Sequence, residues 1–220
     1  MSLTTLFSDI ADAIRAKTGS SATIVANNFP SAIASIPAGS KMELASVSNL
    51  NNLFNSQGDS ISNLLYVAPD FDTTGCTTME YMFRGCTALV SVPAYKTSSV
   101  TNMSGMFINC DSLVTAPSFD TSSVTDFSSM FLGCTALENV PLYDTSSATT
   151  LVGTFASCEY LTNDSLNNIL AMCAGVSSSY AVSKVLQYVI DLQYYDESTI
   201  TGLSNYQAFI DAGWTIGDDT

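Results

Sequence analysis

At 220 residues with 46% hydrophobic content, the chain has enough apolar material for a buried core, and intrinsic disorder is not expected. Twenty acidic residues against six lysines and arginines give a net charge of −14, which would repel nucleic-acid phosphates and anionic membrane surfaces. The sequence has no histidine, so the commonest general base and the commonest metal ligand are both missing. We therefore expect no enzymatic activity and no metal or other cofactor.

Residues 1–40 are predicted to form a helical attachment segment. Apolar residues at helical spacing mark an amphipathic helix over about residues 3–17, and Gly19 stands where that helix would end. The apolar stripe either packs on its own domain or docks onto a partner subunit. Asp9 and Asp12 leave no continuous apolar run near the N-terminus and no basic region precedes them, so we do not expect a secretory signal peptide. No stretch is long and apolar enough for a membrane span, which predicts a cytoplasmic product.

An internal repeat of constant period occupies the middle of the chain. Its clearest markers are four equally spaced cysteines, which define that period: Cys86, Cys110, Cys134 and Cys158. A phenylalanine three positions before each cysteine and a leucine three positions after it keep the same spacing. A degenerate earlier copy begins at Val47, carries a short insertion around residues 57–60, and rejoins the register at Leu65. Such self-similarity is typical of a repeat architecture.

Within one unit, the spacing of Val100, Met103, Met106 and Phe107 predicts a short helix of about two turns. The alternation over residues 113–116 predicts a short strand, which ends at a proline because proline cannot donate a backbone hydrogen bond. The Asp-Thr-Ser-Ser stretch that follows supplies turn and cap chemistry. One unit buries about six apolar side chains worth roughly 2 kcal/mol each. Ordering its backbone costs on the order of 1–2 kcal/mol per residue, so the units have to stack.

The predicted fold is therefore an α/β solenoid of leucine-rich repeats, with a short strand and a short helix in each coil and about five coils over residues 41–160. Residues 161–220 are predicted to form a helical C-terminal cap, because an open end would expose the apolar columns. Helical stripes run over residues 166–173 and 182–189. Ser204 and Gln207 fit a capping box that opens a further helix, which Gly213 ends.

The repeat resembles the BspA-like leucine-rich repeats, whose units read V-T-N-M-x-x-M-F-x-x-C-x-x-L, because residues 100–113 read V-T-N-M-S-G-M-F-I-N-C-D-S-L. That resemblance implies a solenoid used for attachment to surfaces, as in bacterial surface proteins and in phage or prophage tail proteins. Residues 3–37 look like the N-terminal segment of tail or fibre proteins from phages of Firmicutes. Residues 165–214 are similar to the end of prophage-encoded repeat proteins. Together the resemblances favour a phage tail or fibre protein.

Two repeated residue types invite a chemical interpretation. The four periodic cysteines are predicted to form a structural ladder of reduced thiols, because leucine-rich repeats place a buried Asn or Cys at this position and cytoplasmic synthesis disfavours disulfides. The sequence has no C-x-x-C pair, so zinc is not expected. Asp72, Asp120 and Asp144 recur at one turn position, where turn capping is the main interpretation. A calcium ladder is the alternative, although Lys96 interrupts the series.

The candidate binding residues are positions expected to face solvent on the sheet and the adjoining turns, where the units differ while the core columns do not. They are Ser91, Ala94, Lys96, Thr115, Ser118, Asn139, Leu142 and Asp144. Variable exposed positions on a constant frame are typical of ligand-binding repeat proteins. An unconstrained surface would show the same variation.

The main functional hypothesis is a virion protein, associated with a tail or fibre and assembled in the host cytoplasm. It would join other virion or tail proteins through residues 1–40 and recognise a host surface protein or glycan through the solenoid, as a monomer or a homo-oligomer. The alternative is a BspA-like adhesin at the bacterial cell surface. A glycan-active enzyme that uses paired carboxylates is a third hypothesis. The acidic residues argue against it, because they lie mostly in turns. Neither nucleic acid nor membrane is an expected partner.

Overall fold

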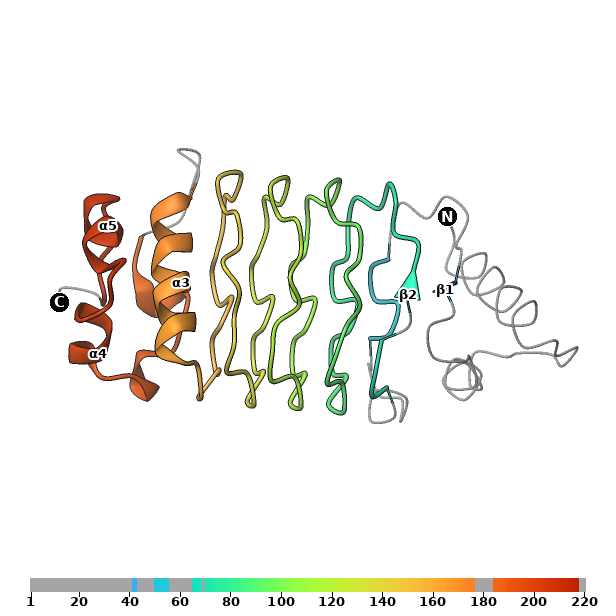
Figure 1. The fold of residues 1–220 in the computed structure, drawn as a ribbon, viewed down its shortest axis with the longest axis horizontal. Helices are drawn as coiled ribbons and strands as arrows, with labels where there is room; N and C mark the ends of the chain where they lie inside the picture. The colour runs from blue at the N-terminus through green and yellow to red at the C-terminus, as the bar shows by residue number, and fades with distance from the viewer. Residues whose placement is uncertain (1–40, 43–49, 56–64, 69, 177–183, 218–220) are drawn as a thin grey trace, which may run out of the picture.

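The computed structural model describes residues 41–42, 50–55, 65–68, 70–176 and 184–217, which form a row of coils followed by helices (Figure 1). The predicted attachment segment, residues 1–40, lies outside the described residues. Two short strands lie near the start, and helices cluster at the C-terminal end. The elements are β1 (Lys41–Met42), β2 (Asp70–Phe71), α3 (Asn163–Gly175), the 3-10 helices η2 (Leu186–Tyr188) and η3 (Leu192–Tyr194), α4 (Glu197–Thr201) and α5 (Tyr206–Asp211).

Successive coils are joined by backbone hydrogen bonds that keep a constant register. The Met79 amide donates to the Asn102 carbonyl at 2.9 Å, and one repeat later the Met103 amide donates to the Asp126 carbonyl at 3.0 Å. Isolated parallel bridges follow the same register, with Thr78 opposite Asn102 and Asn102 opposite Asp126. Each residue therefore lies beside the residue one full period further along, as the repeat in the sequence requires. Figure 1 shows the coils side by side along the long axis.

The predicted helix in each unit is replaced by a chain of tight turns. Between β2 and α3, where every residue is described, none is in an α-helix. The amides of Met103, Gly105 and Phe107 donate to the next coil. The amides that alternate with them bond within their own coil: Ser104 donates to the Asn102 side chain, and Met106 and Ile108 donate to carbonyls three positions back. Gly105 has a left-handed φ of 60°, which an α-helix does not contain. The apolar residues have the spacing of a helix, but every second amide donates its hydrogen bond to the neighbouring coil, so the bonds of a helix cannot form.

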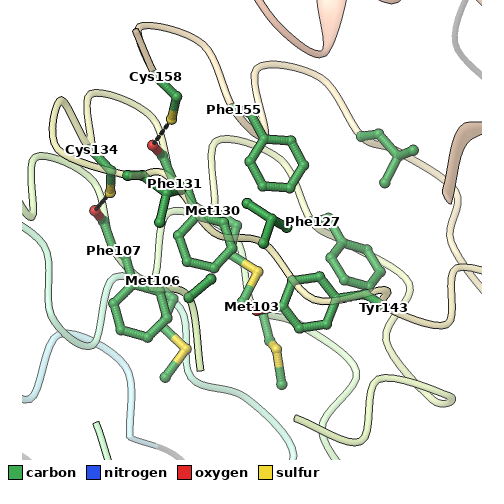
Figure 2. Close-up of a cluster of buried hydrophobic side chains, with 14 of the residues drawn as sticks. Met103, Met106, Phe107, Phe127, Met130, Phe131, Cys134, Tyr143, Phe155 and Cys158 are labelled. Atoms are coloured by element: carbon green, nitrogen blue, oxygen red, sulfur yellow. Dashed lines mark hydrogen bonds between the residues drawn. The ribbon is translucent and has the colours of Figure 1, made fainter. Parts of the chain in front are cut away.

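Phenylalanine side chains form a continuous stack through the coils. Phe83, Phe107, Phe131 and Phe155 follow one another with ring centroids 5.5, 5.2 and 5.5 Å apart and planes within 9° of parallel. All four rings are fully buried. Figure 2 shows three of them in a row beside Met106 and Met130. Stacked pairs add about 0.5–1.5 kcal/mol each beyond the burial of their surface, so this column strengthens with every coil that repeats it.

The first described contacts between layers join residues that are more than one period apart. β1 pairs in parallel with β2 through Lys41 opposite Asp70 and Met42 opposite Phe71, so the two strands are further apart in the sequence than one period. The Phe54 ring stacks on Phe83 at 5.4 Å, so Phe54 extends the phenylalanine column by one coil. The insertion predicted around residues 57–60 lies outside the described residues.

The C-terminal part continues the stack and adds helices along one side of it. Phe155 bridges in parallel to Ile190, and Val185 bridges in parallel to Thr215, so two further layers follow the coils. Helix α3 packs against the last coil, where the buried Thr145 hydroxyl donates to the Met172 carbonyl at 2.6 Å. Helix α5 follows α3, with the Asn205 amide donating to the Asn167 side chain at 2.9 Å. The structure therefore ends in layers that carry α3, α4 and α5 (Figure 1).

Two local predictions for this region are wrong. Residues 184–189 of the second predicted helical stripe form an isolated bridge at Val185 and the 3-10 helix η2 instead of an α-helix, because their amides and carbonyls bond to the layers on either side. The capping box does not form either. Asn205 is the residue that precedes α5, it makes no side-chain cap, and the Ser204 hydroxyl donates to Asn167 at 3.1 Å. Tertiary partners on α3 replace the local cap.

Gly105 offers a test of the turn chain. It has a left-handed φ of 60°, and a Cβ added there would lie 2.2 Å from the Tyr81 ring of the preceding coil. Gly75 has a φ of 80° but open space around its Cβ position, so it is the matched control. Both alanine variants bear about 1–2 kcal/mol of backbone strain. We expect Gly105→Ala to lower the free energy of unfolding by about 1–3 kcal/mol more than Gly75→Ala, because of the clash.

Urea denaturation of the two variants measures this difference. Repeating the pair in a Tyr81→Ala background should remove most of the excess, since the ring that clashes is then absent. Equal destabilisation of the two glycine variants would show that the turn chain is not packed as described.

Candidate functional site

All eight candidate binding residues are exposed, and the coils arrange them in rows. Thr115 bridges in parallel to Asn139, and Ser91 occupies the same place one coil earlier. The other rows follow from the same register: Ala94, Ser118 and Leu142, then Lys96 and Asp144. The stacking therefore places the candidates together on one side of the coils. We call this side, with the additional residues described next, the variable face.

Three exposed apolar residues of the variable face were missed by the sequence analysis. Tyr66 is 64% exposed, Val67 54% and Val114 43%, and Leu142, already among the candidates, is 61% exposed. The Val90 amide donates to the Tyr66 carbonyl at 2.9 Å, which places Tyr66 one coil before Val90 and two before Val114. The register of the repeat could have predicted two of them, because Leu65 aligns with Leu89 and Tyr66 and Val67 then take the exposed positions that follow it.

Lys96 is a cation on the edge of the variable face. Its ammonium group donates to the Thr74 hydroxyl at 3.0 Å and lies 3.7 Å from a carboxylate oxygen of Asp72 in the preceding coil. The lysine side chain is 63% exposed, and ion pairs of that exposure contribute only about 0–1 kcal/mol. The contact therefore positions Lys96 loosely and leaves it accessible to a ligand.

The repeated aspartates close local turns. One oxygen of Asp144 accepts the Ser146 amide at 2.9 Å, and Asp72 and Asp120 accept the amide two positions later in the same way. The pKa of Asp144 is lowered, because the Ser146 hydroxyl and amide stabilise the charged carboxylate. Turn capping accounts for the spacing of these residues. In the part of the chain that the structure describes, no group of three or more His, Cys, Asp or Glu side chains could hold a metal ion.

The repeated cysteines form a buried column in which each thiol bonds to the backbone. The Cys110 Sγ lies 3.3 Å from the Phe83 carbonyl oxygen, the Cys134 Sγ lies 3.0 Å from that of Phe107, and Cys158 repeats the contact with Phe131 (Figure 2). All six cysteines are free and buried, including Cys76 and Cys173 outside the column. Burial raises the pKa of Cys86 to about 12, so this thiol stays protonated and unreactive at neutral pH.

The fold and this surface define a class: a repeat protein whose stacked coils hold constant buried columns and present varied side chains on one side. The family comparison gives the particular assignment. Residues 25–116 and 77–191 match the family described as "Mycoplasma protein of unknown function, DUF285", and the chain belongs to that family. No curated protein and no solved structure matches the chain. Among the helices that the structure describes, none has the length and apolar character needed to cross a membrane.

The thiol column yields a prediction about reactivity. At pH 8, we expect the six cysteines of the native protein to react with iodoacetamide at least about a hundredfold more slowly than those of the urea-unfolded chain. Reaction requires opening of the core, and an opening free energy of about 3 kcal/mol gives that factor. Mass spectrometry of labelled peptides reads out each site.

The same burial predicts a pH dependence of stability. The pKa of Cys86 is about 12 in the folded chain against 9.0 for a free thiol. The contribution of the protonated Cys86 thiol to the free energy of unfolding is therefore complete below pH 9 and is lost as the pH rises toward 12, because only the unfolded chain releases the proton in that window. Cys86→Val should flatten this part of the curve. Labelling of a column cysteine in the native state at the unfolded rate would contradict the buried column.

Proposed function

We propose that this chain is a non-enzymatic virion protein of phage or prophage, tail- or fibre-associated, whose leucine-rich-repeat solenoid recognises a host surface protein or glycan. The observation that carries the proposal is the contrast between the two sides of each coil. The buried columns of phenylalanine, cysteine and methionine repeat almost unchanged, whereas the variable face differs from coil to coil and exposes Tyr66, Val67, Val114 and Leu142. Varied exposed residues on a constant frame are how repeat proteins adapt to different ligands.

The resemblance to BspA-like repeats and to phage tail proteins supplies the biological setting of the proposal. Residues 1–40 would join the chain to other virion or tail proteins, and the stack would carry the variable face away from the particle. Copies of the chain could also assemble with one another, as subunits of tail fibres do. A protein or glycan is favoured over nucleic acid and anionic lipid as the ligand because of the net charge of −14.

A BspA-like bacterial cell-surface adhesin is the second candidate. Membership of the DUF285 family favours it, because that family often occurs in BspA-like leucine-rich-repeat surface proteins. Both candidates use the same surface, and they differ in where the protein is found.

Fractionation of the source strain separates the two candidates. After prophage induction, particles purified on a gradient and the cell-envelope fraction are analysed side by side by peptide mass spectrometry. We expect peptides of this chain in the particles, at a constant ratio to other virion proteins through successive gradient fractions. Enrichment in the envelope would refute the virion assignment and favour the adhesin. Release of sugars from host wall polysaccharide by the purified protein would instead favour a glycan-active enzyme.

Binding by the variable face is tested with exposed-residue variants. Tyr66→Ala and Leu142→Ala remove side chains that are 64% and 61% exposed, so each should change the free energy of unfolding by less than about 0.5 kcal/mol. We expect each to weaken adsorption of the fluorescently labelled protein to host cells by roughly 5- to 30-fold, the effect of losing about 1–2 kcal/mol at an interface. Ile210→Ala, on α5, is the matched control. Unchanged adsorption by both face variants would exclude this surface.

A further inference from the structure

One boundary between neighbouring coils lacks the backbone hydrogen bonds that the boundaries on either side of it have. It lies on the variable face, between residues 90–92 of one coil and residues 114–116 of the next, and we call it the open seam. Both segments belong to the part of the chain that the structure describes. The equivalent segments of the flanking coils are residues 66–68 and 138–140.

Hydrogen bonds in both directions cross each of the two neighbouring boundaries. They are the bonds from the Val90 amide to the Tyr66 carbonyl at 2.9 Å, from the Ala68 amide to the Ser91 carbonyl at 3.0 Å, from the Glu138 amide to the Val114 carbonyl at 2.9 Å and from the Ala116 amide to the Asn139 carbonyl at 2.8 Å. Each of these boundaries also has a parallel bridge, Val67 with Ser91 and Thr115 with Asn139. The pattern is therefore the same on both sides of the open seam.

Neither bond of this pattern forms at the open seam itself. Shifting the pattern by one period predicts that the Val114 amide donates to the Val90 carbonyl, and that the Val92 amide donates to the Thr115 carbonyl. Among the residues that the structure describes, neither amide has an acceptor, and no bridge joins the two segments. The ladder of backbone bonds on this side of the coils is therefore interrupted at one place.

Burial gives an independent sign of the interruption. Ala68, Ala116 and Val140 occupy the third position of their segments and are 3%, 2% and 4% exposed. Val92 occupies the same position in its own coil but is only half-buried, and Val114 across the seam is 43% exposed. The side chains beside the open seam are therefore less closely covered than their equivalents in the other coils.

Elsewhere, the same two coils are joined to each other. On the turn chain, the Phe83 amide donates to the Met106 carbonyl at 2.9 Å, and the rings of Phe83 and Phe107 stack at 5.5 Å. Beyond the seam, the Thr97 hydroxyl donates to the Asp120 carbonyl at 2.8 Å. The interruption is thus confined to one side of the coils, and separation there breaks none of the contacts that hold the stack together.

We propose that the open seam is a conformational device of the variable face, at which residues 90–92 and 114–116 move apart and together while the rest of the stack stays closed. Segments with few internal hydrogen bonds open at the lowest free energy. Opening changes the spacing between Ser91 and Thr115, so a ligand that contacts both residues selects one spacing. The effect on a ligand rests on the proposed binding by the variable face, whereas the movement itself does not.

Amide hydrogen exchange of the full chain, followed by NMR so that each amide is resolved, tests the movement. After correction for the intrinsic rate of each sequence, we expect the Val92 and Val114 amides to exchange at least about tenfold faster than those of Val90 and Ala116. These two control amides lie in the same segments but donate across the neighbouring boundaries. Equal protection of all four amides would overturn the proposal.

A crosslink distinguishes a moving seam from a fixed gap. The double variant Ser91→Cys with Thr115→Cys places one cysteine on each side of the seam, and strand spacing falls within the Cα separation of about 4.4–6.8 Å that a disulfide spans. We expect oxidation of this pair to slow exchange of the Val92 and Val114 amides at least about tenfold relative to the same variant kept reduced. The matched control, Thr115→Cys with Asn139→Cys, crosslinks a boundary that is already paired and should leave both amides unchanged.

Two outcomes of the crosslinking experiment would contradict a moving seam. Unchanged exchange after oxidation would show a fixed gap. Failure of the seam pair to oxidise where the control pair does would show that the two segments never approach each other. Both measurements are made without a ligand, so their outcome does not depend on whether the variable face binds a host.

Discussion

The backbone hydrogen bond between one coil and the next is the constraint on which the structure depends. It joins residues at a constant separation, as between Met103 and Asp126, and so places every side chain beside its equivalent in the neighbouring coil. A residue type that recurs at one position of the repeat must therefore pack well against the same residue type in the next coil. Phenylalanine meets this condition by ring stacking, and threonine meets it by bonding to a backbone carbonyl, as Thr97 and Thr121 do. The constant period of the sequence follows directly from this contact.

The same register satisfies polar groups that the core would otherwise bury at a cost. An unpaired buried hydroxyl costs about 1–3 kcal/mol, and Thr97, Thr121 and Thr145 are nearly fully buried. Each bonds to a carbonyl of the next layer, and Thr145 finds the carbonyl of Met172 in α3 where no further coil exists. Helix α3 therefore supplies the polar contact as well as the apolar cover that the last coil requires. This dual role explains why a helix can follow the coils without leaving the buried hydroxyl of the last coil unpaired.

The sequence predicts the columns well and the local backbone poorly, for a physical reason. Period and burial depend on which residues repeat, and these are visible in the chain from Cys86 to Cys158. The turn chain depends instead on left-handed residues, which include Gly105 and Gly133 but also Tyr81, Asn109 and Ser129. In a sequence, glycine is the residue that most clearly predicts a left-handed conformation, because it adopts a positive φ without steric cost. The rows of the candidate surface followed from the period. The register of Tyr66 and Val67 is also visible in the sequence at Leu65, but their exposure depends on the packing of a degenerate copy that departs from the repeat elsewhere.

A rigid stack also explains how this chain can keep apolar and aromatic side chains on its surface. The frame is held by columns that lie on the inside of every coil, so replacing an outward residue such as Leu142 or Tyr160 removes no core contact. What limits exposure is self-association, which apolar surface promotes. The excess of acidic over basic residues counters it, because copies of the chain repel one another while an oppositely charged partner is attracted. Acidity and exposed rings are therefore complementary properties: charge selects which partner approaches, and the rings and aliphatic side chains supply the contact area once it has arrived.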